Sequence, residues 1–198
     1  MIPEPDPVSA RTETPAPEHI PALTLVTGPA RSGKSEWAEA LAVRSGRPVV
    51  YLATAREDPD DADWSARIAQ HRQRRPDHWR TVCVPTGLEA AIASHRAADA
   101  CLLVDSLGTW VANLLELDAA AWDSRVRSLL EVLAPGRGTV ILVGEETGWG
   151  VIPAYPVGRT FRDRLGGLVR RLGPRCEASY LVTGGYAVDL RRLGTPLG

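Results

Sequence analysis

A glycine-rich stretch after the first apolar run carries the residues best suited to chemistry. Residues 28–35 fit the pattern G-x-x-x-x-G-K-[ST]. In this pattern the backbone N–H groups turn toward an anion, and the following helix adds its positive end. Lys34 is expected to reach the β- and γ-phosphates of a nucleoside triphosphate, and the Ser35 hydroxyl to bind Mg²⁺. A glycine turn without a ligand is the alternative. The predicted phosphate-binding loop consists of Gly28, Pro29, Ala30, Arg31, Ser32, Gly33, Lys34 and Ser35.

A second candidate metal ligand follows another apolar run. Such a loop needs a carboxylate to position the metal, usually at the end of a neighbouring strand. The run Cys-Leu-Leu-Val-Asp at 101–105 supplies Asp105. Capping of the next helix, with Ser106 beside it, is the alternative role. Given the phosphate loop we favour the metal role, so Ser35 and Asp105 are the predicted Mg²⁺ ligands. These residues predict nucleotide binding and phosphoryl chemistry.

The elements that position these residues alternate along the chain. Apolar runs predict buried strands at 22–27, 49–53, 101–105 and 139–143. Helical patterns are found at 35–44, about 61–75, 87–98, 108–117, 119–133 and 156–172. Two runs at 179–183 and 186–190, separated by two glycines, predict a C-terminal hairpin. The prediction is an α/β, P-loop NTPase-like fold, with a mostly parallel sheet covered by helices on both faces.

Composition limits the classes of function. The 198 residues include 23 basic and 24 acidic side chains, and this balance argues against a dedicated nucleic-acid binder. No apolar run approaches the roughly 18 residues that a membrane span needs. The three cysteines are widely separated and predict neither a disulfide framework nor a zinc site. Residues 1–21 hold six of the 16 prolines and are predicted to be a disordered tail before a single domain at 22–198. We expect a cytoplasmic protein.

Several further segments, in order from about Leu23 to Leu190, resemble one family closely. They read YLATA at 51–55, RIAQH at 67–71, RPDHWRT at 75–81, LVDSLGTWVANLL at 103–115 and ETGWGVIP at 146–153. Together with the phosphate loop they resemble the bifunctional adenosylcobinamide kinase / adenosylcobinamide-phosphate guanylyltransferase family of cobalamin biosynthesis. The R-I-x-x-H element after an A-T-A strand end is the most specific of these segments, and it separates this family from other P-loop kinases.

The resemblance implies two reactions. In the first, ATP or GTP phosphorylates the aminopropanol hydroxyl of adenosylcobinamide. In the second, GTP transfers GMP to a histidine and then to the new phosphate, which gives adenosylcobinamide-GDP. The resemblance also implies a corrinoid substrate and a homo-oligomer, specifically a trimer. Beyond the phosphate loop, the implied nucleotide-binding residues are Ala53, Thr54, Ala55, Arg72, Gln73, Arg74, Arg75 and Asp105.

The histidine implied by the resemblance is His71. An imidazole with a pKa near 6.5 is largely deprotonated at neutral pH, so it qualifies as a nucleophile for phosphorus. Arg67, Arg72, Arg74 and Arg75 lie close in sequence and suit the charge of a triphosphate. Taken alone, His71 would be interpreted as a surface histidine on a basic helix. The family pattern reverses that interpretation and makes it, with Lys34, a predicted catalytic residue.

Some positions leave alternatives open. Glu146 matches a family acid and is expected either to orient the acceptor hydroxyl or to cap a helix. Trp149, between two glycines, is a candidate for exposure to substrate. Cys83 stands where the family usually has an acidic residue that contacts nucleotide, and Ala154 and Val169 also depart from its pattern. We expect these departures to affect base preference and corrinoid contacts more than the chemistry.

Two other functions share the same phosphate loop. One is a small-molecule kinase with a different acceptor, in which His71 only binds phosphate and no covalent GMP forms. The other is a regulator without catalytic activity that responds to a bound triphosphate. A GMP adduct after incubation with GTP and Mg²⁺ separates the family function from both.

Overall fold

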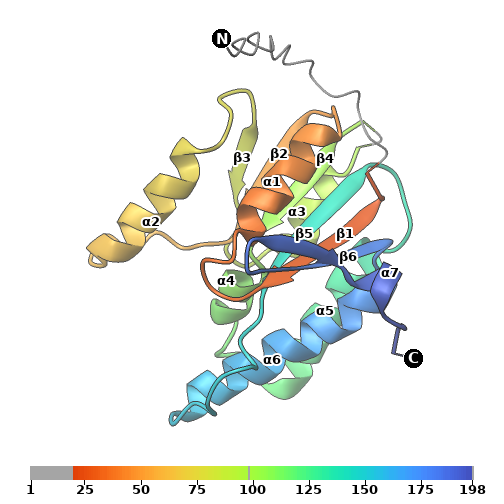
Figure 1. Ribbon diagram of the computed structural model, residues 1–198. Helices are drawn as coiled ribbons and strands as arrows, with labels where there is room; N and C mark the ends of the chain where they lie inside the picture. The colour runs from red at the N-terminus through yellow and green to blue at the C-terminus, as the bar shows by residue number, and fades with distance from the viewer. Residues whose placement is uncertain (1–19, 98, 198) are drawn as a thin grey trace, which may run out of the picture.

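A computed structural model describes residues 20–97 and 99–197, shown as a coloured ribbon in Figure 1. The predicted tail at 1–21 therefore lies outside the described residues, except for Ile20 and Pro21. Ile20 is buried and packs with the core. No helix in the described ranges has the length and apolarity needed to cross a membrane.

One sheet forms the centre of the described chain, with strand order β3-β2-β4-β5-β1-β6-β7. The strands are β1 Leu23–Gly28, β2 Val49–Ala53, β3 Arg80–Cys83, β4 Cys101–Asp105, β5 Thr139–Glu145, β6 Ala178–Thr183 and β7 Tyr186–Asp189. Neighbouring strands are parallel, except for the antiparallel pair β6 and β7. The mostly parallel sheet and the C-terminal hairpin are confirmed.

The helices follow the strands in the predicted alternation. They are α1 Lys34–Arg44, α2 Ala62–Gln73, α3 Leu88–His95, α4 Leu107–Ala112, α5 Ala119–Val132, α6 Pro156–Leu172 and α7 Leu190–Leu193, with a 3₁₀ turn at Gly173–Arg175. Side chains fix several N-termini. Asp61 accepts a hydrogen bond from the Trp64 backbone N–H, and Asp118 accepts one from the Ala121 N–H. Pro156 occupies the first turn of α6, where no hydrogen-bond donor is lost.

Helices cover both faces of the sheet, as predicted. Within β4, Leu102 and Val104 pack with residues of α3, α4, α5 and α6 in one cluster. Cys101 and Leu103 face the other way and pack with residues of α1 in a second cluster. Side chains alternate between the faces of a strand, so a strand that is apolar throughout requires cover on both sides.

Several predicted elements end at other residues in the structure, and three of them end earlier than predicted as follows. The helix expected at 108–117 ends at Ala112, and the helix expected at 87–98 ends at His95. The strand expected to reach residue 190 ends at Asp189, whose side chain caps α7. β3 was not predicted, because three of its four residues are exposed and it lies at the edge of the sheet, so it lacks the apolar signal of a buried strand.

The topology brings four strand ends to one edge of the sheet. In the parallel register Gly28 of β1 pairs with Glu145 of β5, and Ala53 of β2 pairs with Asp105 of β4. Ligands collect outside the carboxyl ends of parallel strands. α2 stands to one side of the sheet, between β2 and β3 in the chain (Figure 1).

Candidate functional site

The loop between β1 and α1 has the close packing expected of an anion-binding turn. A Cβ at Gly28 would lie 2.4 Å from the Val182 carbonyl oxygen, so only glycine fits there. Gly33 has φ +89°, a conformation that glycine adopts without strain. Lys34 is 7% exposed, and its Nζ donates to the Pro29 carbonyl oxygen at 3.4 Å. The lysine is thus held inside the loop rather than extended into solvent.

Asp105 lies at the end of β4, next to the phosphate loop. The Tyr51 hydroxyl donates to its Oδ2 at 2.7 Å, and burial raises the pKa of Tyr51, which keeps that hydroxyl protonated. The helix-capping role that competed for Asp105 is filled by Ser106, whose side chain accepts from the Thr109 backbone N–H. The carboxylate of Asp105 is therefore not used as a cap.

Glu145 is a site residue that the sequence reasoning did not assign. Its Oε1 accepts a hydrogen bond from the Ser106 hydroxyl at 2.5 Å, and its Oε2 accepts one from the Gly108 backbone N–H at 2.9 Å. A Cβ at Gly108 would lie only 2.0 Å from that Oε2. Burial raises the pKa of Glu145, while the bond from Ser106 and the charge of Lys34 act in the opposite direction. The carboxylate thus anchors the turn that follows Asp105. The position of Glu145 at the end of a buried strand is the sequence feature that could have identified it as a site residue.

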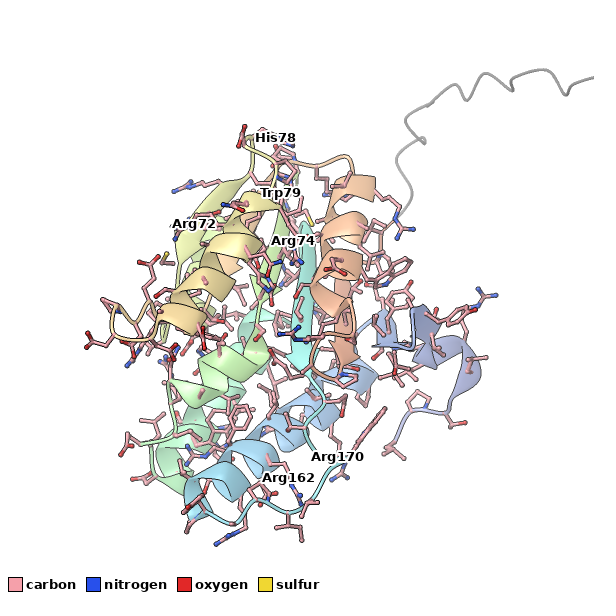
Figure 2. All side chains as sticks on the ribbon, turned by 60° about the vertical axis from the view of Figure 1, so that its left-hand side comes forward. Arg72, Arg74, His78, Trp79, Arg162 and Arg170 are labelled. Atoms are coloured by element: carbon pink, nitrogen blue, oxygen red, sulfur yellow. The ribbon has the colours of Figure 1, made fainter. Side chains whose placement is uncertain are left out.

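His71 lies near the end of α2 and faces the same edge of the sheet. Its Nδ1 is 3.9 Å from Asp105 Oδ2 and 3.2 Å from Nη2 of Arg74. Arg74 also reaches α1, where its Nη1 lies 2.7 Å from Glu36 Oε1 and its Nη2 lies 3.7 Å from Glu39 Oε1. Figure 2 shows Arg74 on the side of α2 that faces α1. These contacts connect the helix that carries His71 to the helix that follows the phosphate loop.

The other residues of the basic stretch behave differently from one another. The guanidinium of Arg75 stacks on the Tyr51 ring, with its Cζ 3.5 Å from the ring centroid. Arg72 is exposed and pairs with Glu57 at 2.7 Å. Gln73 is exposed. The side chains of this stretch therefore make different contacts and do not form one basic patch.

Two chambers meet at these residues. A polar chamber of about 1070 Å³ lies between the phosphate loop and α2, and a more apolar one of about 370 Å³ lies toward β2, β4 and α6. Both are lined by Lys34, Ser35, Trp64 and His71. The predicted residues that line at least one chamber are Ala30, Arg31, Ser32, Gly33, Lys34, Ser35, Ala53, Ala55, His71, Arg72, Arg74, Arg75 and Asp105. Gly28, Pro29, Thr54 and Gln73 line neither.

The candidate metal ligands, Ser35 and Asp105, suit a magnesium ion that is bound together with the phosphates of a nucleotide. Within 20–97 and 99–197, no group of three or more His, Cys, Asp and Glu side chains is arranged to hold a metal by itself. Mg²⁺ usually keeps several waters and takes one or two protein ligands in addition to phosphate oxygens. The Ser35 hydroxyl and the Asp105 carboxylate line the same chamber, so this pair fits that requirement.

Of the remaining positions singled out in the sequence, only Cys83 lines one of the two chambers. Cys83 is exposed and forms part of the wall of the apolar chamber. Glu146 lines neither chamber, and burial raises its pKa while a hydrogen bond with Thr27 lowers it. Trp149 is 66% exposed. Val169 packs against the core and Ala154 is exposed.

Comparisons with known proteins agree with this geometry. The family model for cobinamide kinase / cobinamide phosphate guanyltransferase matches residues 24–190. The bifunctional adenosylcobalamin biosynthesis protein CobP of Pseudomonas aeruginosa is 43% identical over 174 residues, which cover 87% of this chain and 98% of that protein. The protein CobU of Salmonella typhimurium is 34% identical over 183 residues, which cover 85% of this chain and 99% of that protein.

Solved structures are similar in fold. The flagellar accessory protein FlaH of Methanocaldococcus jannaschii matches with a TM-score of 0.50 and 15% identity, over 90% of this chain and 84% of that one. An ATPase of a bacterial type III secretion system matches with a TM-score of 0.51 and 11% identity, over 88% of this chain and 58% of that one. Together with the sheet order, these likenesses confirm the P-loop NTPase-like fold.

Proposed function

The chain belongs to the cobinamide kinase / cobinamide phosphate guanyltransferase family, and from this premise we propose that it carries out both reactions at the site described above. A nucleoside triphosphate, ATP or GTP, phosphorylates the hydroxyl of adenosylcobinamide. GTP then supplies GMP to the resulting phosphate. The observation that carries the proposal is that His71 lines both chambers together with Lys34 and Ser35, and lies 3.9 Å from Asp105.

In the kinase step the phosphate loop holds the triphosphate and Lys34 stabilises charge on the γ-phosphate. The acceptor hydroxyl oxygen attacks the γ-phosphorus and releases its proton to water, the bond from the γ-phosphorus to the bridging oxygen breaks, and the nucleoside diphosphate leaves with the electron pair. Ser35 and Asp105 are the residues that would hold Mg²⁺, which supplies charge neutralisation on the phosphates when bound. Glu145 holds the turn after Asp105 in place through Ser106 and Gly108.

In the guanylyl step a ring nitrogen of His71 attacks the α-phosphorus of GTP and pyrophosphate leaves. The phosphate of the acceptor then attacks the same phosphorus, the N–P bond breaks, and the histidine is regenerated. Arg74 lies within reach of both the imidazole and the polar chamber, so its charge suits the phosphates there. A homotrimer, which the family resemblance implies, and a cytoplasmic location, which is expected from the composition, complete the proposal.

The test uses intact mass after incubation with GTP and Mg²⁺. Wild-type protein should gain one GMP in an acid-labile, base-stable bond. His71→Ala should lose the adduct and guanylyl transfer but keep measurable phosphorylation of adenosylcobinamide, since γ-phosphoryl transfer needs no covalent intermediate. The matched control is His78→Ala, because His78 is exposed, lines neither chamber and lies beside Trp79 (Figure 2). An adduct that forms in His71→Ala at the wild-type rate would refute the assignment.

A further inference from the structure

The loop that joins β5 to α6 carries a large amount of exposed apolar surface. Trp149 is 66% exposed, Val151 95%, Ile152 65% and Tyr155 77%, and these four side chains are called the apolar loop cluster. With Val157 they account for five of the ten large hydrophobic residues that are exposed in the described ranges, all within residues 149–157. Apolar side chains gathered in this way on a surface mark a binding site.

Both ends of this loop are fixed to the body of the protein. At its start the Glu146 backbone N–H donates to the Gly28 carbonyl oxygen at 3.0 Å, which ties the loop to the phosphate loop. At its far end Arg159 donates to the carbonyl oxygens of Pro153 at 3.0 Å and Ala154 at 2.7 Å. The two ends of the loop that carries the cluster are therefore held in place, which limits the positions that the cluster can take, and such restriction favours binding.

The apolar loop cluster is also close in sequence to residues that line the 370 Å³ chamber. Thr147, two residues before Trp149, lines the 370 Å³ chamber, and so does Phe161 of α6. Lys34 and Asp105 line the same chamber. A molecule that lies on the apolar loop cluster can therefore extend a short arm past Thr147 to the phosphates.

We propose that the apolar loop cluster binds the corrin macrocycle of the acceptor, an inference that rests on the proposed function. A chamber of 370 Å³ is near the lower limit for pockets that enclose small organic ligands, and a macrocycle bearing an adenosyl group exceeds it. The 1070 Å³ chamber is lined mainly by polar and charged side chains such as Arg31, Asp61 and Asp63, which do not suit the apolar faces of the macrocycle. Only the aminopropanol arm then enters, and the macrocycle stays outside on Trp149 and its neighbours.

The experiment makes two measurements. The Kd for adenosylcobinamide is determined from the visible colour that the protein retains on ultrafiltration. The KM for the same acceptor is determined from the rate of its phosphorylation. The variants are Trp149→Ala and Ile152→Ser, both at exposed positions where substitution leaves the core intact. Each is expected to raise Kd and KM for the acceptor by about tenfold or more, as loss of an apolar anchor does at an interface. GMP adduct formation from GTP alone should stay within about twofold of wild type. Tyr186→Ala, which removes an equally exposed aromatic ring from β7, is the matched control.

The possible outcomes separate the two proposals. Wild-type Kd and KM in both cluster variants, with a wild-type enzyme that phosphorylates the acceptor, would overturn the inference and leave the proposed function standing. A wild-type enzyme that neither binds nor phosphorylates the corrinoid would refute both. A fall in sedimentation mass in Trp149→Ala, with acceptor binding unchanged, would assign the cluster to an interface between copies of this chain and likewise overturn the inference.

Discussion

The contact between Gly108 and Glu145 makes a sharp test of how this site is built. Replacement of Gly108 by alanine would place a methyl carbon 2.0 Å from Glu145 Oε2 and 2.6 Å from its Cδ. Real Cβ atoms essentially never approach so closely, so the carboxylate must leave its position. It would then lose its hydrogen bonds from the Ser106 hydroxyl and the Gly108 N–H.

The loss in the free energy of unfolding can be worked out from those two hydrogen bonds. Hydrogen bonds to a charged group contribute about 1.5–3 kcal/mol each to stability. Alanine in place of glycine in a helix returns about 0.5–1 kcal/mol. The free energy of unfolding should therefore fall by about 2–5 kcal/mol, and Tm by on the order of 10 °C for a chain of this length. Because the displaced turn directly follows Asp105, both the kinase and the guanylyl reaction should slow.

Urea unfolding and thermal scans measure the effect, with Gly166→Ala as the matched control. Gly166 lies inside α6, and the position that a Cβ would take there is open, so alanine should stabilise the protein by about 0.5–1 kcal/mol. The double variant Gly108→Ala/Glu145→Ala removes the clash, so it should be more stable than the sum of the two single effects implies. A loss below about 1 kcal/mol in Gly108→Ala would refute the argument, because it would mean that the carboxylate moves aside at little cost.

Three further predictions follow from the site. Lys34→Ala should abolish kinase turnover and strongly reduce GMP adduct formation, since the chain contains no second lysine; turnover assays that stay within a few-fold of wild type would contradict it. Burial raises the pKa of the Cys101 thiol to about 11 and that of Cys176 to about 12, so a thiol reagent at about pH 8 should modify only Cys83 rapidly, with Mg·GTP slowing it. In urea titrations Glu145→Gln should gain stability relative to wild type as pH rises above the ordinary glutamate pKa of 4.5, because burial raises the pKa of Glu145 and makes ionisation of this carboxylate in the folded protein costly.

The parts of the fold that sequence predicts well are those where burial dictates residue type. The run Cys101–Asp105 was predicted to the residue because β4 is apolar on both faces, in the middle of the sheet. β3 was missed for the opposite reason, since an edge strand with exposed residues has no apolar pattern. The phosphate loop could be found because its backbone geometry demands glycines at fixed spacing.

Contacts between distant segments could not be predicted in this way. The bonds from Ser106 and Gly108 to Glu145 join residues 39 and 37 positions apart, and no local pattern records them. The same holds for Arg74, which the sequence suggested only as a cation beside phosphate, and which the structure also joins to Glu36 of α1. Such side chains show their roles only when the sheet order brings their strands and helices together.

The electrostatics of the site predict that nucleotide binding depends on a divalent cation. Burial raises the pKa of both Glu145 and Glu39, and the negative charge of Asp105 raises both further, so Asp105 repels each of these carboxylates before any ligand binds. Lys34 opposes this effect at Glu145, and Arg74 and Arg75 oppose it at Glu39. A triphosphate with several further negative charges must therefore enter beside carboxylates whose charge these three cations only partly offset. Nucleotide without Mg²⁺ should bind weakly for this reason, because a divalent ion held by Ser35 and Asp105 would supply positive charge that offsets this repulsion.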